Sequence, residues 1–175
     1  NNGLVINKGE ISHDVQCVTL KKWQKKYLST TKKPLPKHQD FFYELDYNTP
    51  ASDIKFYDIK ANRNLFWVST NIGIFTLQEN GELYRYLPLH TEEFDFTNTG
   101  NLIETNPYEG LRVYQDLDKF EYKYYGIDLK TTPTMVVNSL RKGDKTYFLS
   151  IFSGLYAWQN NQFISYVPDG VGLEK

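Results

Sequence analysis

The side chains that could carry metal or nucleophilic chemistry are few and scattered along this chain. The three histidines, His13, His38 and His90, lie far apart in the sequence, and Cys17 is the only cysteine. No two of them have the spacing at which short motifs hold zinc. We therefore expect no metal site, place each histidine on the surface or in a loop, and interpret Cys17, in a β-like run, as a small core residue.

Carboxylate pairs are the remaining candidates for acid–base catalysis. Glu92 adjoins Glu93, and Asp116 lies near Asp118. Their settings are typical of hairpin turns, where aspartate caps backbone amides. The sequence shows no Gly-rich phosphate loop, no nucleophile elbow and no Ser/His/Asp arrangement. We therefore expect no catalytic residue, no cofactor and no enzyme activity.

Aromatic side chains offer binding rather than catalysis, and the chain has many of them, with 14 Tyr and 11 Phe. Exposed tyrosines can stack on a sugar ring or on a partner protein. Tyr122, Tyr124 and Tyr125, bounded by Gly126, form the densest group, and we predict them as a ligand-binding patch. The alternative is that they are scattered surface aromatics without a role.

The charge balance excludes general electrostatic binding to nucleic acid or to an anionic membrane. The chain has 20 basic and 21 acidic residues and a net charge of −1. Its one basic stretch contains Lys21, Lys22, Lys25, Lys26, Lys32, Lys33 and Lys37. We interpret that stretch either as a contact for an anion or, as we prefer, as the solvated edge of a sheet. The chain has no run of about 18 apolar residues, which is the length that would predict a membrane span.

Short apolar or alternating runs separated by turn residues predict many short strands. Residues 64–86 read as a strand, a tight turn with Gly73, a second strand, an Asn-Gly hairpin and an aromatic strand. Residues 146–166 repeat this order around Gly154, and residues 102–124 repeat it more weakly around Gly110. These glycines are 37 and 44 residues apart (110 − 73 and 154 − 110). Steps of about 40 residues are typical of four-stranded propeller blades.

The fold class that follows is all-β, with about four propeller-like blades in a closed, incomplete or open propeller. We predict a single β-repeat domain over 1–175, with blades at 15–47, 52–88, 93–125 and 133–167 after a half blade at 3–14. Residues 19–28 have a helix-like 3/4 spacing of apolar side chains, but we interpret them as two strands joined by a lysine-rich turn. The recurring aromatic residues, expected to pack between blades, are Trp67, Phe75, Phe148, Tyr156 and Trp158.

The motif at residues 64–75 resembles the N-L-W-I-G-T-x-x-G-L-Y core of two-component-regulator propeller repeats, although Ser69 stands where that family has glycine. Residues 153–158 with 163–166 resemble the continuation of the same repeat, and residues 167–173 resemble the turn into a next blade. Such repeats form the periplasmic sensor regions of Bacteroidetes-type hybrid histidine kinases and related regulators.

This resemblance implies a non-catalytic ligand-sensing module of a periplasmic or extracellular signalling protein, with an oligosaccharide or other small ligand as its partner. One alternative is a structural or protein-interaction propeller platform, and a second is a carbohydrate-active enzyme on a propeller fold. The chain starts partway through a repeat, so we interpret it as a fragment of a longer propeller. We expect a homodimer or neighbouring propeller segments to cover its unmatched edges.

Overall fold

The computed structural model describes residues 13–30, 49–106, 110–126, 132–133 and 135–166, with side chains in the first of these ranges from residue 19 onward. The chain divides into two compact units, Asn1–Glu92 and Glu93–Lys175. The predicted half blade at 3–14 falls almost wholly outside the described residues. That the chain behaves as one repeat domain stays a prediction.

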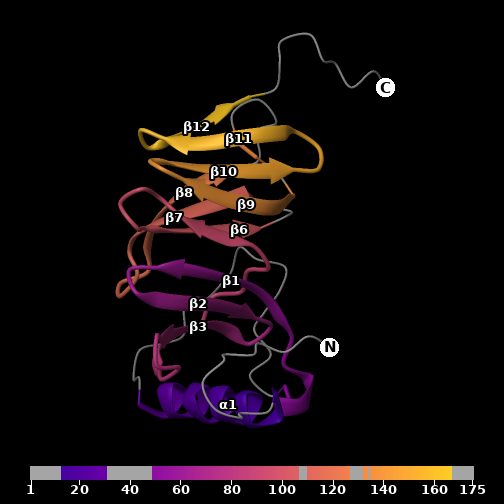
Figure 1. Ribbon diagram of the computed structural model, residues 1–175, viewed down its shortest axis with the longest axis vertical. Coiled ribbons are helices and arrows are strands. Elements are labelled where there is room, and N and C mark those ends of the chain that lie inside the picture. Colours follow the sequence, from indigo (N-terminus) through magenta and orange to yellow (C-terminus); the bar gives the residue numbers. More distant parts are fainter. Residues whose placement is uncertain (1–12, 31–48, 107–109, 127–131, 134, 167–175) are drawn as a thin grey trace. The chain divides into compact units, whose positions relative to one another are not determined.

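Three four-stranded antiparallel sheets account for the described strands (Figure 1). Sheet 1 contains β1 (Phe56–Asn62), β2 (Leu65–Thr70), β3 (Gly73–Gln78) and β4 (Leu83–Leu87). Sheet 2 contains β5 (Phe94–Phe96), β6 (Leu102–Asn106), β7 (Gly110–Asp116) and β8 (Glu121–Gly126). Sheet 3 contains β9 (Val136–Lys142), β10 (Lys145–Ser150), β11 (Gly154–Gln159) and β12 (Gln162–Ser165). Two shorter elements, α1 (His13–Thr30) and the 3-10 turn η1 (Ala51–Asp53), precede sheet 1.

In each sheet the four strands follow one another in chain order, as in the blade of a propeller. Sheets 1 and 3, at 56–87 and 136–165, lie inside the expected ranges 52–88 and 133–167, and sheet 2, at 94–126, extends one residue beyond the expected range 93–125. The prediction of an all-β fold built from four-stranded repeats is therefore confirmed. Arg63 and Asn64 join β1 to β2, and Asn160 and Asn161 join β11 to β12, in tight turns whose four residues all have positive φ.

Helix α1 corrects the prediction for the first repeat. Residues 13–30 form a helix of 18 residues instead of two strands, so Cys17 lies in a helix, and residues 31–47 of the expected blade 15–47 lie outside the described residues. The 3/4 spacing was the correct signal, because it places Leu20, Trp23 and Tyr27 on one side. Lysine and glutamine are also good helix formers. Strand-like propensity at the end of the segment was overridden by packing.

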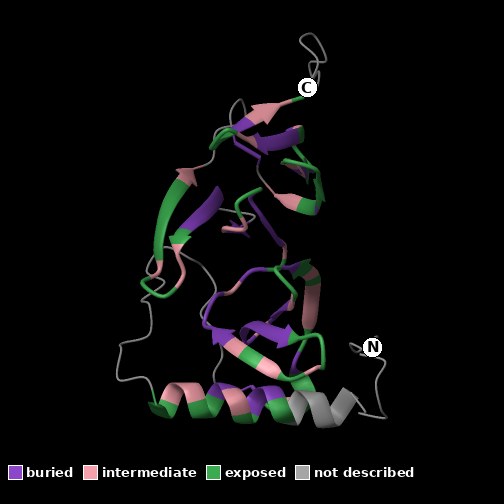
Figure 2. Cartoon of the chain, turned by 60° about the vertical axis from the view of Figure 1, so that its left-hand side comes forward, coloured by how far each residue is buried: buried purple, intermediate pink, exposed green. Residues whose placement is uncertain are grey.

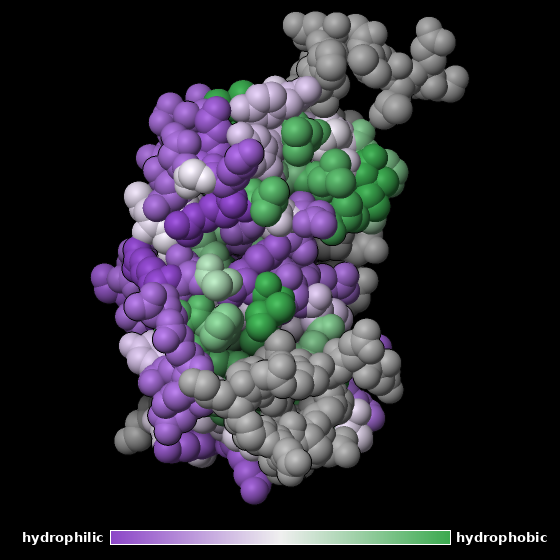
Figure 3. All heavy atoms as spheres, in the orientation of Figure 1, coloured by the Kyte–Doolittle hydropathy of each residue, from purple (hydrophilic) through white to green (hydrophobic). Residues whose placement is uncertain are grey.

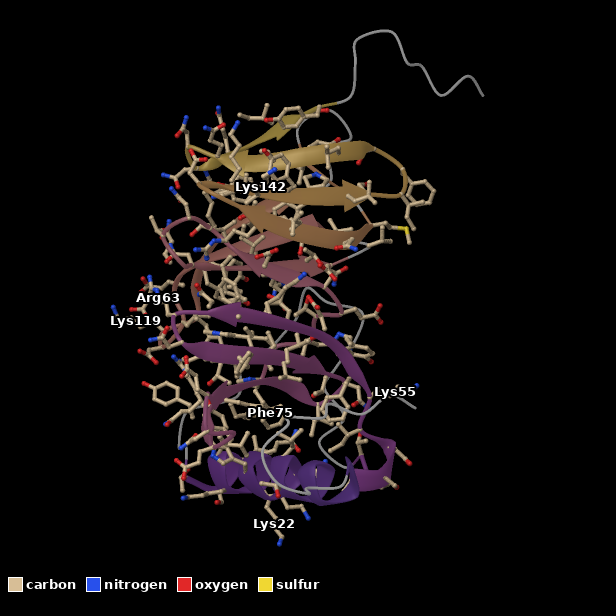
Figure 4. All side chains as sticks on the ribbon, viewed as in Figure 1. Lys22, Lys55, Arg63, Phe75, Lys119 and Lys142 are labelled. Atoms are coloured by element: carbon tan, nitrogen blue, oxygen red, sulfur yellow. The ribbon has the colours of Figure 1, made fainter. Side chains whose placement is uncertain are left out.

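The packed side of α1 covers one face of sheet 1, which we name the helix face (Phe75 and Tyr86) (Figure 2). The indole of Trp23 lies edge-on to both rings, with centroid distances of 6.4 Å to Phe75 and 5.9 Å to Tyr86. Figure 4 shows Phe75 on the side of the sheet nearest α1 and Lys22 pointing away from it. The exposed lysines include Lys22, while Lys21 is buried, so only part of the basic stretch is solvated.

A polar contact fixes α1 within this apolar interface. The side-chain amide of Gln24 is fully buried and donates hydrogen bonds to the carbonyl oxygen of Ile72 at 3.1 Å and to the hydroxyl of Tyr86 at 3.2 Å. Tyr86 in turn donates to the same Ile72 oxygen at 2.7 Å. Because buried polar groups need such partners, these bonds specify the position of the helix along the β2–β3 turn.

Sheets 2 and 3 pack face to face and share one core. Ile103, Leu111 and Val113 form the apolar face of sheet 2. They contact the aromatic face of sheet 3, formed by Phe148, Tyr156, Trp158 and Phe163. Polar bonds join the start of sheet 2 to β9 and β10: the Ser139 hydroxyl donates to Glu93 Oε1 at 2.6 Å, and the Thr146 hydroxyl donates to the Phe96 carbonyl oxygen at 2.5 Å.

The three repeat glycines each begin the third strand of a sheet with positive φ: +122° at Gly73, +122° at Gly110 and +87° at Gly154. A side chain at Gly73 would also collide with its neighbours, since an added Cβ would lie 2.5 Å from the Tyr86 ring and 2.7 Å from the Leu87 carbonyl oxygen. Both the backbone conformation and the space therefore require glycine here.

We predict that Gly73→Ala lowers the free energy of unfolding by about 2–5 kcal/mol, because backbone strain adds to a steric clash. Gly143→Ala is the matched control. Gly143 also has positive φ, +64°, but an added Cβ would meet nothing within 4 Å. Strain alone should cost about 1–2 kcal/mol there. Urea denaturation followed by circular dichroism measures both, and equal losses in the two variants would contradict the steric argument.

We also predict that Trp23→Ala lowers the free energy of unfolding of the unit containing sheet 1 by about 2 kcal/mol, because it removes a half-buried ring from the helix interface. Its neighbour Lys22 is exposed, so Lys22→Ala should change stability by less than about 0.5 kcal/mol. Thermal and urea unfolding give the values. A Trp23→Ala variant as stable as Lys22→Ala would show that α1 does not contribute to this unit.

Candidate functional site

The predicted tyrosine patch lies on β8, the edge strand of sheet 2, which pairs with β7 on one side only. Residues 121–124 are exposed, and the exposed fractions of Tyr122 and Tyr124 are 39% and 52%. Edge strands present side chains and backbone groups to solvent or to a partner. β8 is therefore placed as a binding strand would be.

The structure divides the three tyrosines between the two faces of sheet 2. Tyr122 is paired with Tyr114 and Tyr124 with Arg112, so both rings belong to one face. Tyr125 belongs to the other face and packs edge-on against Trp158 and Phe163, with centroid distances of 5.4 Å to each. It contributes to the core shared with sheet 3. Tyr122 and Tyr124 alone remain together as candidate ligand contacts.

Beneath these two rings lies a group of charged and polar side chains that the sequence analysis did not single out. Glu104, Arg112 and Tyr114 form what we name the charged face of sheet 2, and all three are buried. The Tyr114 hydroxyl donates to Glu104 Oε2 at 2.6 Å, and Arg112 Nη1 lies 4.0 Å from the same oxygen. Alignment of the repeats on their glycines could have revealed this group. Arg112 stands two residues after Gly110, just as Phe75 stands two residues after Gly73 and Tyr156 two residues after Gly154.

The charged face connects to the exposed tyrosines through Arg112. Its guanidinium carbon lies 4.8 Å from the centre of the Tyr122 ring, a cation–π distance, and the Tyr114 and Tyr122 rings are 5.5 Å apart. Tyr122 therefore contacts two buried side chains, which restrict its ring. A ring held in one position loses less conformational entropy when it binds.

Burial is the largest cause that raises the pKa of Tyr114 well above its ordinary value, and the adjacent negative charge and hydrogen bond of Glu104 raise it further. Tyr114 thus stays protonated and serves as the donor that Glu104 requires. Buried ionic groups of this kind contribute more to a specific arrangement than to net stability.

The other candidates occupy structural positions. Asp116 accepts hydrogen bonds from the backbone amides of Asp118 and Lys119, and these bonds lower the pKa of its carboxyl, as expected of an aspartate that caps a turn. His90 packs edge-on against Tyr57 at 6.1 Å. The side chains of His13 and His38 lie outside the described residues.

Within the described ranges, no three His, Cys, Asp or Glu side chains are grouped so as to hold a metal ion. No described helix is both long and apolar enough to cross a membrane.

No family model, curated protein or solved structure matches this chain. The shared feature that the structure does show is the four-stranded antiparallel sheet, repeated three times and consistent with propeller-like blades.

We predict that stability falls above about pH 10 and that Tyr114→Phe flattens this fall. Tyr114 has a higher pKa in the folded than in the unfolded chain. Its contribution is therefore fully present below the unfolded pKa of about 10 and decreases as the pH rises, by about 1.4 kcal/mol per pH unit for one proton. Urea unfolding between pH 8 and 11 measures the slope.

Tyr84→Phe is the control for this titration, because Tyr84 is 59% exposed and belongs to sheet 1. It should leave the slope of stability against pH as it is in the unmodified chain. A Tyr114→Phe variant whose alkaline slope also equals that of the unmodified chain would rule out the protonated Tyr114 as the linked group.

Proposed function

We propose that this chain is a non-catalytic binding module of an extracytoplasmic signalling protein and that its ligand contacts Tyr122 and Tyr124. One observation carries the proposal: two exposed tyrosines share one face of an edge strand, and a buried guanidinium holds one of them in place. Exposed and immobilised aromatic rings suit the apolar faces of sugar rings. An oligosaccharide is accordingly the ligand class that we propose.

The proposed signalling context rests on the repeat motif. The residues that resemble the two-component-regulator repeat core form β2, the turn after it and the start of β3. Within that motif Trp67, Gly73 and Phe75 are buried. A sensor of this kind needs no chemistry, because a ligand that binds one packing arrangement more tightly than another shifts the population between them.

A protein-interaction platform is the second candidate function. The same strand β8 supports it, since an edge strand with an exposed backbone can accept a strand from another protein. The two functions differ in what a substitution should do. Side-chain truncation weakens a stacked sugar, whereas strand addition depends on backbone hydrogen bonds and tolerates a change from tyrosine to another strand-forming residue.

We predict that Tyr124→Ala weakens oligosaccharide binding about two- to thirteenfold, as expected for the loss of one aromatic contact of about 0.5–1.5 kcal/mol. Tyr84→Ala is the matched control, because Tyr84 is a tyrosine of similar exposure on another sheet. A glycan array followed by calorimetry on any hit provides the measurement. Equal weakening in both variants, or an array without any hit, would argue against the proposed ligand class.

A further inference from the structure

The hairpin between β3 and β4 contains an asparagine followed by a glycine, the sequence in which an asparagine side chain is chemically least stable. Asn80 is exposed at the hairpin tip, and Gly81 follows it with a φ of +84°. Among the described asparagines, Asn80 is the one that precedes a glycine, and the other Asn-Gly pair in the sequence, Asn2-Gly3, lies outside the described residues. Because glycine has no side chain, the approach to its amide nitrogen is unobstructed.

A hydrogen bond within the hairpin positions the side chain of Asn80 for attack by the next residue. Its oxygen Oδ1 accepts from the backbone amide of Glu82 at 3.0 Å. A bond from a side chain to the amide two residues later is an Asx turn, and it folds the side chain over the intervening amide, here that of Gly81. The same bond draws electron density from the side-chain carbonyl group. The Cγ carbon of Asn80 is therefore a better electrophile.

One further bond of the hairpin opposes the reaction, because the Gly81 amide donates to the carbonyl oxygen of Gln78 at 2.9 Å and must be released first. Exposed tips with few contacts open locally at little cost in free energy. The β3–β4 hairpin lies at the same end of sheet 1 as the β1–β2 turn, which Figure 4 marks at Arg63, and Figure 3 shows largely hydrophilic residues along this side. Solvent therefore reaches the reacting groups.

We propose that Asn80 is a site of spontaneous deamidation in the folded chain. The Gly81 amide loses its proton to hydroxide, and its nitrogen forms a bond to Cγ of Asn80. The Cγ–Nδ2 bond then breaks, and the leaving nitrogen takes a proton from water and departs as ammonia. Water opens the resulting succinimide ring at one of its two carbonyl carbons and leaves aspartate or isoaspartate. Nothing is oxidised or reduced. The site lies on sheet 1 and is independent of the proposed ligand contacts on sheet 2.

The modification changes the strand to which α1 is attached. Either product adds a negative charge between Glu79 and Glu82, which are both exposed, and like charges repel. Isoaspartate also carries the main chain through its own side chain, which lengthens the hairpin by one methylene group. The strand that follows, β4, holds Tyr86, whose hydroxyl accepts the hydrogen bond from Gln24 of α1. Deamidation therefore loosens the hairpin that anchors the helix.

Peptide mapping by mass spectrometry, after incubation of the folded chain at a series of pH values, tests the proposal. Asn160 and Asn161 are internal controls, because they are exposed in the β11–β12 turn, the equivalent hairpin of sheet 3, and neither precedes a glycine. Asn80 should convert at least about tenfold faster than either, which corresponds to a barrier lower by about 1.4 kcal/mol. Its rate should rise with pH, because the attacking amide must lose a proton.

Two variants complete the experiment. Asn80→Gln keeps an amide at the tip but would have to close a larger ring, so residue 80 should then stay intact. Asn80→Asp adds the charge without lengthening the main chain, so the aged unmodified chain should unfold at a lower urea concentration than this variant.

Three outcomes would overturn the proposal. An Asn80 that stays intact until urea unfolds the chain would show that the folded hairpin protects it. Conversion of Asn160 and Asn161 as fast as Asn80 would show that the Asn-Gly hairpin has no special reactivity. An aged chain as stable as Asn80→Asp would show that isoaspartate does not loosen the hairpin.

Discussion

The structure depends on one constraint: a four-stranded sheet has two large faces and cannot bury either of them alone. Burial of apolar surface is the main favourable term in folding, so each face needs a neighbour. In the first unit α1 covers the helix face of sheet 1. In the second unit the apolar face of sheet 2 covers the aromatic face of sheet 3. On the other face of sheet 3, Leu149 and Leu155 stay exposed.

The constraint also explains why a helix stands where a strand repeat was expected. A helix with Leu20, Trp23 and Tyr27 on one side supplies the same kind of surface as a neighbouring sheet. The exposed Lys22, Lys25 and Lys26 give α1 a polar outer side. The surface shape of the covering element, and not its secondary structure, thus decides whether it can cover a sheet.

Sheet 2 departs from the pattern by placing Glu104, Arg112 and Tyr114 at positions where the other repeats have apolar side chains. The cost of burying these polar groups is offset in part by the Tyr114–Glu104 hydrogen bond and by Arg112, whose Nη1 lies 4.0 Å from Glu104 Oε2. The buried Arg112 also positions the Tyr122 ring. The weakest of the sequence repeats is therefore the one with the most distinctive chemistry.

The sequence by itself determined the strands, the turns and the repeat step, because alternation, Asn-rich hairpins and the glycines at 73, 110 and 154 are local properties. It also indicated that Tyr122 and Tyr124 are exposed, but it grouped Tyr125 with them. Only the tertiary structure decided the rest. Leu20, Trp23 and Tyr27 fit a helix or a strand until their contacts with sheet 1 select the helix. Tyr125 is as aromatic as its neighbours, but the faces of β8 alternate and its own face meets sheet 3. Burial is a relation between segments far apart in the chain, so no local pattern could assign it.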